Sequence, residues 1–143
     1  MCYDLSNLNS DADLVLSRAR ALLGSLLIAP RAIVGSALPP KTNGVYNFSV
    51  EDEIIYVGEA AGSSGLRDRI LSKHVSGDEG HALQSECKVK FPDRLDRRSF
   101  IKSSVSVQWV KNPDSLMVSL VEKLAIAAIK PCLNKAVVNR TER

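Results

Sequence analysis

Leucines recur at helical spacing early in the chain, between a polar start and Pro30. Ser10 is a suitable helix N-cap, and the acidic residues that follow it lie where the helix dipole favours negative charge. The pattern therefore predicts a helix from about Asp11 to about Ile28. The segment 31–43, which contains Pro39-Pro40, is predicted to be an irregular lead-in.

Three short segments have the pattern of β-strands. Val45–Phe48 and Ile54–Val57 are rich in β-branched and aromatic residues, and the polar stretch Ser49–Glu53 between them fits a hairpin turn. In Val105–Trp109, apolar residues alternate with polar ones, as in a strand with one buried face. We expect these strands to form one small, mainly antiparallel sheet.

Two further helices are predicted around this sheet. Gly62–Gly65 forms a loop, after which the apolar spacing predicts a helix from about Leu66 to about Val75. Pro113-Asp114 opens a long helix with a continuous apolar stripe, which Pro131 ends. From Asp78 to Ser104 the pattern is weak. The expected fold is α+β, a mainly antiparallel three-stranded sheet flanked by helices, with an extra N-terminal helix.

Composition narrows the class of protein without naming a function. The chain has 143 residues, 45% of them hydrophobic and 24% charged, which is ordinary for one globular domain. A net charge of +3 is compatible with a nucleic-acid partner. The three cysteines have no paired spacing, so neither a disulfide framework nor a structural zinc site is expected. The longest apolar run, Ala21–Ala29, is too short for a bilayer that needs ~20 residues. We expect a cytoplasmic protein with no membrane partner.

Two tripeptides on the predicted hairpin carry a family resemblance. Gly44-Val45-Tyr46, followed by Tyr56-Val57-Gly58, resembles the signature of the GIY-YIG nuclease superfamily. The resemblance continues at Leu66-Arg67-Asp68-Arg69, at Glu122 in the last long helix, and at Lys130-Pro131-Cys132-Leu133-Asn134. It implies a GIY-YIG-like nuclease domain at residues 43–137, after an N-terminal helix and lead-in segment (1–42) and before a tail (138–143).

The resemblance implies a divalent-metal-dependent endonuclease that hydrolyses phosphodiester bonds in DNA, as a restriction-type or a structure-directed enzyme. Glu122 would be the ligand of Mg²⁺ or Mn²⁺, because such ions favour hard oxygen donors and keep several waters. The alternative is an exposed helix glutamate paired with a nearby lysine. Tyr46 would act at the attacking water as general base or proton relay, and Tyr56 would orient the water or phosphate. Glu59 is a weaker candidate for a water-mediated contact with the metal.

Further site residues follow from the same resemblance. Arg69 would form a forked contact with the scissile phosphate. Its spacing from the second tripeptide is longer than usual, which an insertion in the glycine-serine loop explains, and Arg67 would take the role if the register shifts. His74 is a candidate second base, with a solvated histidine as the alternative. The amide of Asn134 would fix a backbone or side chain at the site, and a plain helix cap is the other interpretation.

A basic stretch is predicted to follow the DNA backbone, although a solvated loop would have the same composition. Its cationic residues are Lys88, Lys90, Arg94, Arg97, Arg98 and Lys102. The first rival function is a non-catalytic DNA-binding module that retains the GIY-YIG fold. The second is a protein-interaction domain with coincidental motifs. The sequence leaves open whether the chain forms a homodimer to cut both strands.

Overall fold

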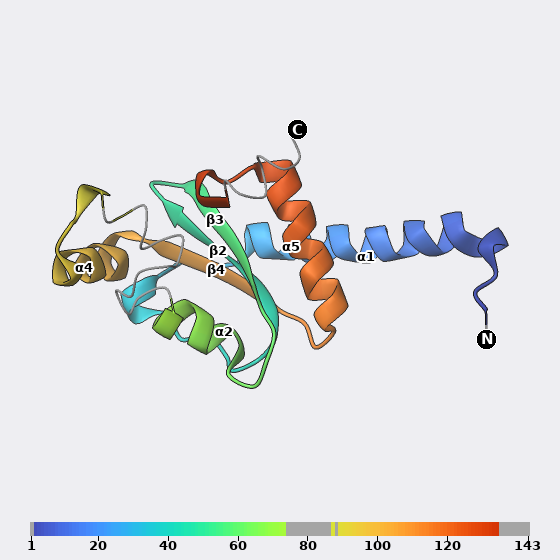
Figure 1. Ribbon diagram of the computed structural model, residues 1–143, viewed down its shortest axis with the longest axis horizontal. Helices are drawn as coiled ribbons and strands as arrows, with labels where there is room; N and C mark the ends of the chain where they lie inside the picture. The colour runs from blue at the N-terminus through green and yellow to red at the C-terminus, as the bar shows by residue number, and fades with distance from the viewer. Residues whose placement is uncertain (1, 74–86, 88, 135–143) are drawn as a thin grey trace.

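The computed structural model describes residues 2–73, 87 and 89–134. Its α-helices and β-strands are α1 (Leu8–Ile28), β1 (Ala32–Ile33), β2 (Gly44–Val50), β3 (Glu53–Ala60), α2 (Gly65–Arg67), α4 (Arg94–Ser104), β4 (Ser106–Lys111) and α5 (Ser115–Ile129), as Figure 1 shows. Short helical segments are η1 (Leu5–Asn7), η2 (Val34–Ser36), the π-helical η3 (Asp68–Lys73) and η4 (Cys132–Asn134). The predicted α+β class is confirmed.

The sheet is antiparallel throughout, with strand order β1-β4-β2-β3. It has four strands where three were predicted, because Ala32–Ile33 pairs with the start of β4. A strand of this length has no periodicity from which a sequence could reveal it. The hairpin turn is shorter than predicted, since only Glu51 and Asp52, at φ 50° and 67°, separate β2 from β3. β3 is the last strand in this order, so it forms one edge of the sheet.

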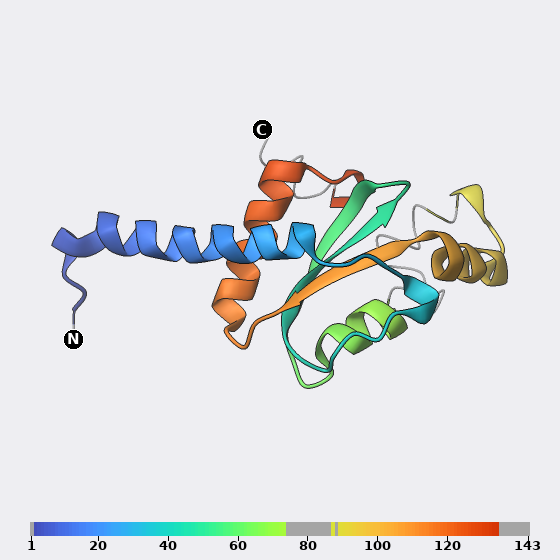
Figure 2. The same ribbon diagram turned by 180° about the vertical axis from the view of Figure 1, so that it is seen from behind.

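Helices cover both faces of this sheet (Figures 1 and 2). On one face, α5 and the C-terminal half of α1 bury a cluster that includes Val45, Val57 and Leu26. On the other face, α2, η3 and α4 cover Tyr46 and Phe48. The N-terminal helix thus shares a core with the predicted nuclease domain instead of standing apart from it.

The α1 helix begins earlier than predicted. It starts at Leu8, directly after η1, whose N-cap Asp4 accepts a hydrogen bond from the Ser6 N–H at 2.9 Å. Ser10 is therefore not the N-cap; its hydroxyl donates to the Asn7 carbonyl inside the first turn. At the other end, the Gln108 amide of β4 donates to carbonyls of the last turn and the C-cap, which ties α1 to the sheet.

The α4 helix was not predicted. Asp93 caps it by accepting hydrogen bonds from two backbone N–H groups of the first turn. Its buried residues are Ile101 and Arg97, one turn apart. Because one of these two buried residues is an arginine, the sequence shows no apolar stripe from which the helix could be predicted.

The two helices predicted after the hairpin differ in how closely they match the structure. The helix predicted from Leu66 to Val75 is a single α turn followed by the π-helical η3, and residues from position 74 lie outside the described part of the chain. The last helix agrees with prediction: Asp114 is its N-cap, and it ends at Lys130, which has a left-handed φ of 52°. No helix of the described residues is long and apolar enough to cross a membrane.

Candidate active site

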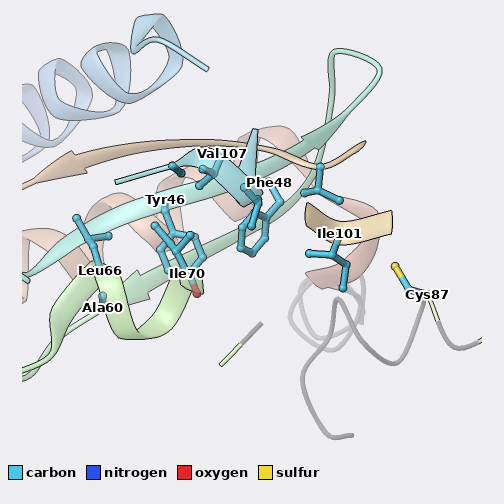
Figure 3. Packing of buried hydrophobic residues seen from close by; sticks show 11 residues of the cluster. Tyr46, Phe48, Ala60, Leu66, Ile70, Cys87, Ile101 and Val107 are labelled. Atoms are coloured by element: carbon cyan, nitrogen blue, oxygen red, sulfur yellow. The ribbon is translucent and has the colours of Figure 1, made fainter. Parts of the chain in front are cut away.

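Tyr46 lies in the middle of β2, and only 1% of it is exposed. Its ring meets Phe48 edge-on at a centroid distance of 5.4 Å and lies 6.2 Å from the ring of Tyr56. Leu66 and Ile70 cover it from the helical layer, and Figure 3 shows these side chains around the tyrosine. This packing fixes the position of the hydroxyl group.

Gly58 lies directly opposite Tyr46 in the β2–β3 pairing. A Cβ atom on Gly58 would lie 2.5 Å from the Tyr46 hydroxyl oxygen and 2.9 Å from a ring carbon of Tyr56. No real Cβ tolerates such a contact, so only glycine lets both tyrosine rings lie across the sheet at this point. The packing of the two tyrosine rings therefore explains why the second tripeptide ends in glycine, which its spacing in the sequence did not reveal.

Replacing Gly58 with alanine is expected to destabilise the protein by about 1–3 kcal/mol, because the added methyl group overpacks a filled site. The matched control is Gly24→Ala in α1, where a Cβ would meet nothing within 4 Å. That change should stabilise the helix by about 0.5–1 kcal/mol. Denaturant unfolding of both variants measures the two effects. Equal stability of the Gly58 variant and the parent would contradict the close contact.

Tyr56 lies on the edge strand β3 and is partly exposed, and its hydroxyl shares a hydrogen bond with that of Tyr46. Burial raises the pKa of both tyrosines, and the negative charge of Glu122 raises both further. The guanidinium of Arg69 acts in the opposite direction on the pKa of each. The bond between the hydroxyls raises the pKa of Tyr46 and lowers that of Tyr56. Both hydroxyls are therefore protonated near neutral pH.

Glu122 lies on α5 and is buried, with 9% of the residue exposed. Its carboxylate accepts a hydrogen bond from the Lys123 ammonium at 2.8 Å. Burial raises the pKa of Glu122, the bond from Lys123 opposes this, and the charge of Glu59 raises the pKa further. The alternative interpretation of Glu122 was an exposed helix glutamate paired with a lysine. Glu122 is paired with Lys123, but it is buried and not exposed.

Arg69 and Arg67 have different surroundings. The charge of Arg69 lowers the pKa of Tyr46, Tyr56 and Glu122, so this guanidinium lies within electrostatic reach of all three. It is exposed and lines an open hollow of about 400 Å³ with the glycine-serine loop. Arg67 instead donates from its Nε to the Pro39 carbonyl at 2.9 Å and holds the lead-in segment.

Asn134 lies in η4 and pairs with the free edge of β3. Its Oδ1 accepts from the Val57 N–H and its Nδ2 donates to the Val57 carbonyl, each at 3.0 Å. Val57 stands between the tyrosine and the glycine of the second tripeptide. Asn134 therefore satisfies the edge strand where it carries site residues, and it holds backbone instead of touching the other candidate side chains.

The remaining candidates separate into three groups. His74 and Lys88 lie outside the described residues. Arg97 is 4% exposed and donates to the carbonyls of Phe91 and Pro92, so the prediction that it contacts DNA is wrong: its guanidinium is used inside the fold. The other cations of the basic stretch are exposed: Lys90, Arg94, Arg98 and Lys102. The last three are four residues apart and share one face of α4.

The donor set fits a divalent cation only with help from water or substrate. No group of three or more His, Cys, Asp or Glu side chains in the described part of the chain could hold a metal ion. Glu122 and Glu59 are close enough for one charge to raise the pKa of the other. The Glu59 Oε2 is buried and has no hydrogen-bond partner among the described residues. Two carboxylates with one orphaned oxygen suit a cation that keeps several waters.

No family model matches the chain, and no curated protein matches it. Similar solved structures include the GIY-YIG N-terminal endonuclease domain of UvrC from Thermotoga maritima. A tyrosine-to-phenylalanine and an asparagine-to-alanine mutant are each 14% identical to this chain, with a TM-score of 0.44, over 79% of this chain and 93% of theirs. Each is described as bound to its catalytic divalent cation. The likeness is one of overall fold.

Proposed function

We propose that this protein is a divalent-metal-dependent endonuclease that hydrolyses phosphodiester bonds in DNA. The observation that carries the proposal is that the packed pair Tyr46 and Tyr56, with ring centroids 6.2 Å apart, and the buried Glu122 carboxylate both lie within electrostatic reach of Arg69. The members of this group come from β2, β3, α5 and η3. Hydrolysis of a phosphodiester requires a proton acceptor for water, a cation for the phosphoryl oxygens and a ligand for metal, and this group contains all three.

Arg69 would bind the scissile phosphate. Its guanidinium is exposed at an open hollow, where a backbone phosphate can approach without displacing core residues. A forked pair of N–H groups matches two phosphoryl oxygens and stabilises the charge that builds on them. Arg67 has its Nε engaged with the lead-in backbone, which leaves Arg69 as the better candidate.

Tyr46 would act as a proton relay rather than as a phenolate base. Burial and Glu122 keep the pKa of Tyr46 high, so the hydroxyl is protonated near neutral pH. As the water oxygen bonds to phosphorus, the leaving oxygen departs with the electrons of its bond to phosphorus and takes a proton from a solvent water, and Tyr46 accepts a proton from the attacking water. It passes its own proton along the hydrogen bond to Tyr56, which is partly exposed and releases one to solvent. Asn134 is a positioning residue that holds β3 for this relay.

Glu122, with Glu59 beside it, would hold Mg²⁺ or Mn²⁺, and the bound cation would supply Lewis-acid stabilisation of phosphate charge. The Lys123 ammonium donates to the Glu122 carboxylate at 2.8 Å and holds it in place. Lys90 and the face of α4 with Arg94, Arg98 and Lys102 would follow the DNA backbone. Each neutralised phosphate should add about 0.9 to the slope of log affinity against log salt.

A plasmid-nicking assay tests the proposed function. Supercoiled DNA with the protein should become nicked in Mg²⁺ or Mn²⁺ and stay intact in EDTA. The rival, a DNA-binding module that retains this fold without catalysis, predicts salt-dependent binding in both conditions and no nicking in either. A protein-interaction domain predicts neither nicking nor salt-dependent binding to DNA.

A further inference from the structure

An apolar stripe runs the whole length of α1, but the body of the protein covers only its C-terminal half. Its members alternate in steps of four and three residues: Leu8, Ala12, Val15, Ala19, Leu22 and Leu26. Ala19 and Leu26 are fully buried against the body, whereas Leu8 and Val15 are 51% and 41% exposed. Figures 1 and 2 show the N-terminal half of α1 projecting beyond the body in both views.

We propose that this projecting half of α1, residues 8–18, is a dimerisation arm that packs antiparallel against the same arm of a second copy of the chain. A stripe with this alternating spacing is the pattern by which two helices pack side by side. The same stripe already packs against α5 and the sheet further along the helix. The arm therefore exposes the same apolar face of α1 that forms part of the core further along the helix.

The charges beside the stripe select a second copy in the antiparallel direction. Asp11 and Arg18 are seven residues apart, so they lie on the same edge of the stripe. In an antiparallel pair with two-fold symmetry, equivalent edges face each other, and Asp11 of one copy meets Arg18 of the other twice. In a parallel pair this edge would instead face the opposite edge of the partner helix, where Leu16 and Leu23 offer no charge to pair with. The chain is thus complementary to itself in one orientation only.

The same register also places the apolar residues together. If Val15 packs on Val15 at the two-fold axis, Leu8 of one copy reaches the position of Leu22 on the other. A hollow of about 480 Å³ lies there, between α1 and the start of α5, and Arg18, Ala21, Leu22 and Met117 are among its lining residues. Leu8 would enter this hollow while Asp11 pairs with the arginine at its rim. One register therefore satisfies both the charges and the hollow.

The acidic character of the arm argues against other occupants. Asp4, Asp11 and Asp13 lie on or next to it against the single cation Arg18, so its side chains carry a net negative charge that an anionic lipid surface or a DNA backbone would repel. A two-helix contact of this length is smaller than a standard interface of about 800 Å² per partner. The dimer should therefore depend on concentration, with a Kd on the order of 10 µM.

Sedimentation of the full chain from about 1 to about 200 µM spans the expected Kd and tests the proposal. The parent should pass from a 15.6 kDa monomer to a species of twice that mass. The variant Leu8→Glu/Val15→Glu should stay monomeric over the whole range. The matched control is Leu14→Glu, which is 52% exposed but lies about 100° around the helix from Val15 and should dimerise like the parent. Circular dichroism checks that each variant keeps its helix.

A charge exchange tests the orientation independently of the stripe. Asp11→Arg and Arg18→Asp should each weaken the dimer about tenfold or more, and the double variant should recover the parent's affinity. A parent that remains monomeric at the highest concentration overturns the proposal, and so does a double variant no better than either single one. The measurement does not involve DNA or metal, so its outcome is distinguishable from that of the nicking assay.

Discussion

Replacing Glu122 with glutamine is expected to lower the rate of DNA nicking by about 10³-fold or more, because the proposed cation would lose its main ligand and the phosphate would lose the charge stabilisation that the cation would supply. The fold should survive, since glutamine has the same shape and burial already disfavours the charged form of this residue. The measurement is single-turnover nicking in Mn²⁺, with thermal unfolding beside it.

The matched control is Glu53→Gln, which removes an exposed carboxylate at the start of β3 and should leave the rate unchanged. Calorimetric titration with Mn²⁺ provides a readout that does not depend on DNA: the parent and the control bind, and the Glu122 variant binds at least tenfold more weakly. Nicking by the Glu122 variant at the parental rate would remove this residue from the mechanism. Parental Mn²⁺ affinity in that variant would place the cation elsewhere.

Replacing Tyr46 with phenylalanine is expected to slow nicking by about 10²–10⁴-fold, the usual contribution of a positioned proton-transfer group. The ring keeps its contacts with Phe48 and Gly58, and only the hydroxyl and its bond to Tyr56 are lost. Stability should therefore fall by no more than about 0.5–1.5 kcal/mol. Rates at saturating DNA, together with DNA affinity, separate the chemical step from binding.

Tyr3→Phe is the control for the loss of a tyrosine hydroxyl, because Tyr3 lies before α1 and bonds only to Asp11 among the described residues. It should nick DNA like the parent. If Tyr46→Phe weakens DNA affinity and leaves the saturated rate unchanged, the hydroxyl binds substrate and the proton leaves the water by another route. An unchanged rate and an unchanged affinity would give Tyr46 no part in the reaction.

The sequence identified most of the candidate site because two short tripeptides sit on strands whose residues alternate between the two faces of the sheet. That alternation places Tyr46 and Tyr56 toward the same layer, which the packing of both against one core cluster bears out. The sequence favoured Arg69 and left Arg67 as the alternative, since the two are only two residues apart. The structure distinguishes them, because Arg67 donates a hydrogen bond to the Pro39 carbonyl, which comes from a distant part of the chain.

Two of the differences from prediction have a common cause, which is that each concerns a residue whose environment is not local. The Arg97 guanidinium was expected on the surface because charged side chains are rarely buried. Two backbone carbonyls before α4 accept its hydrogen bonds and make its burial possible. The strand at Ala32–Ile33 exists because β4 offers it an edge to pair with. Neither partner can be read from the residues themselves.

Local physical chemistry alone determined the hairpin, the long capped helix from Ser115 to Ile129 and the α+β class, because side-chain periodicity and capping act over a few residues. Tertiary structure alone decided how closely Tyr46 approaches Gly58, that the Glu122 carboxylate is buried, and that α1 leaves half of its apolar stripe uncovered. Each of these depends on contacts between elements distant in sequence, and the free energy of such contacts exists only once the chain has packed.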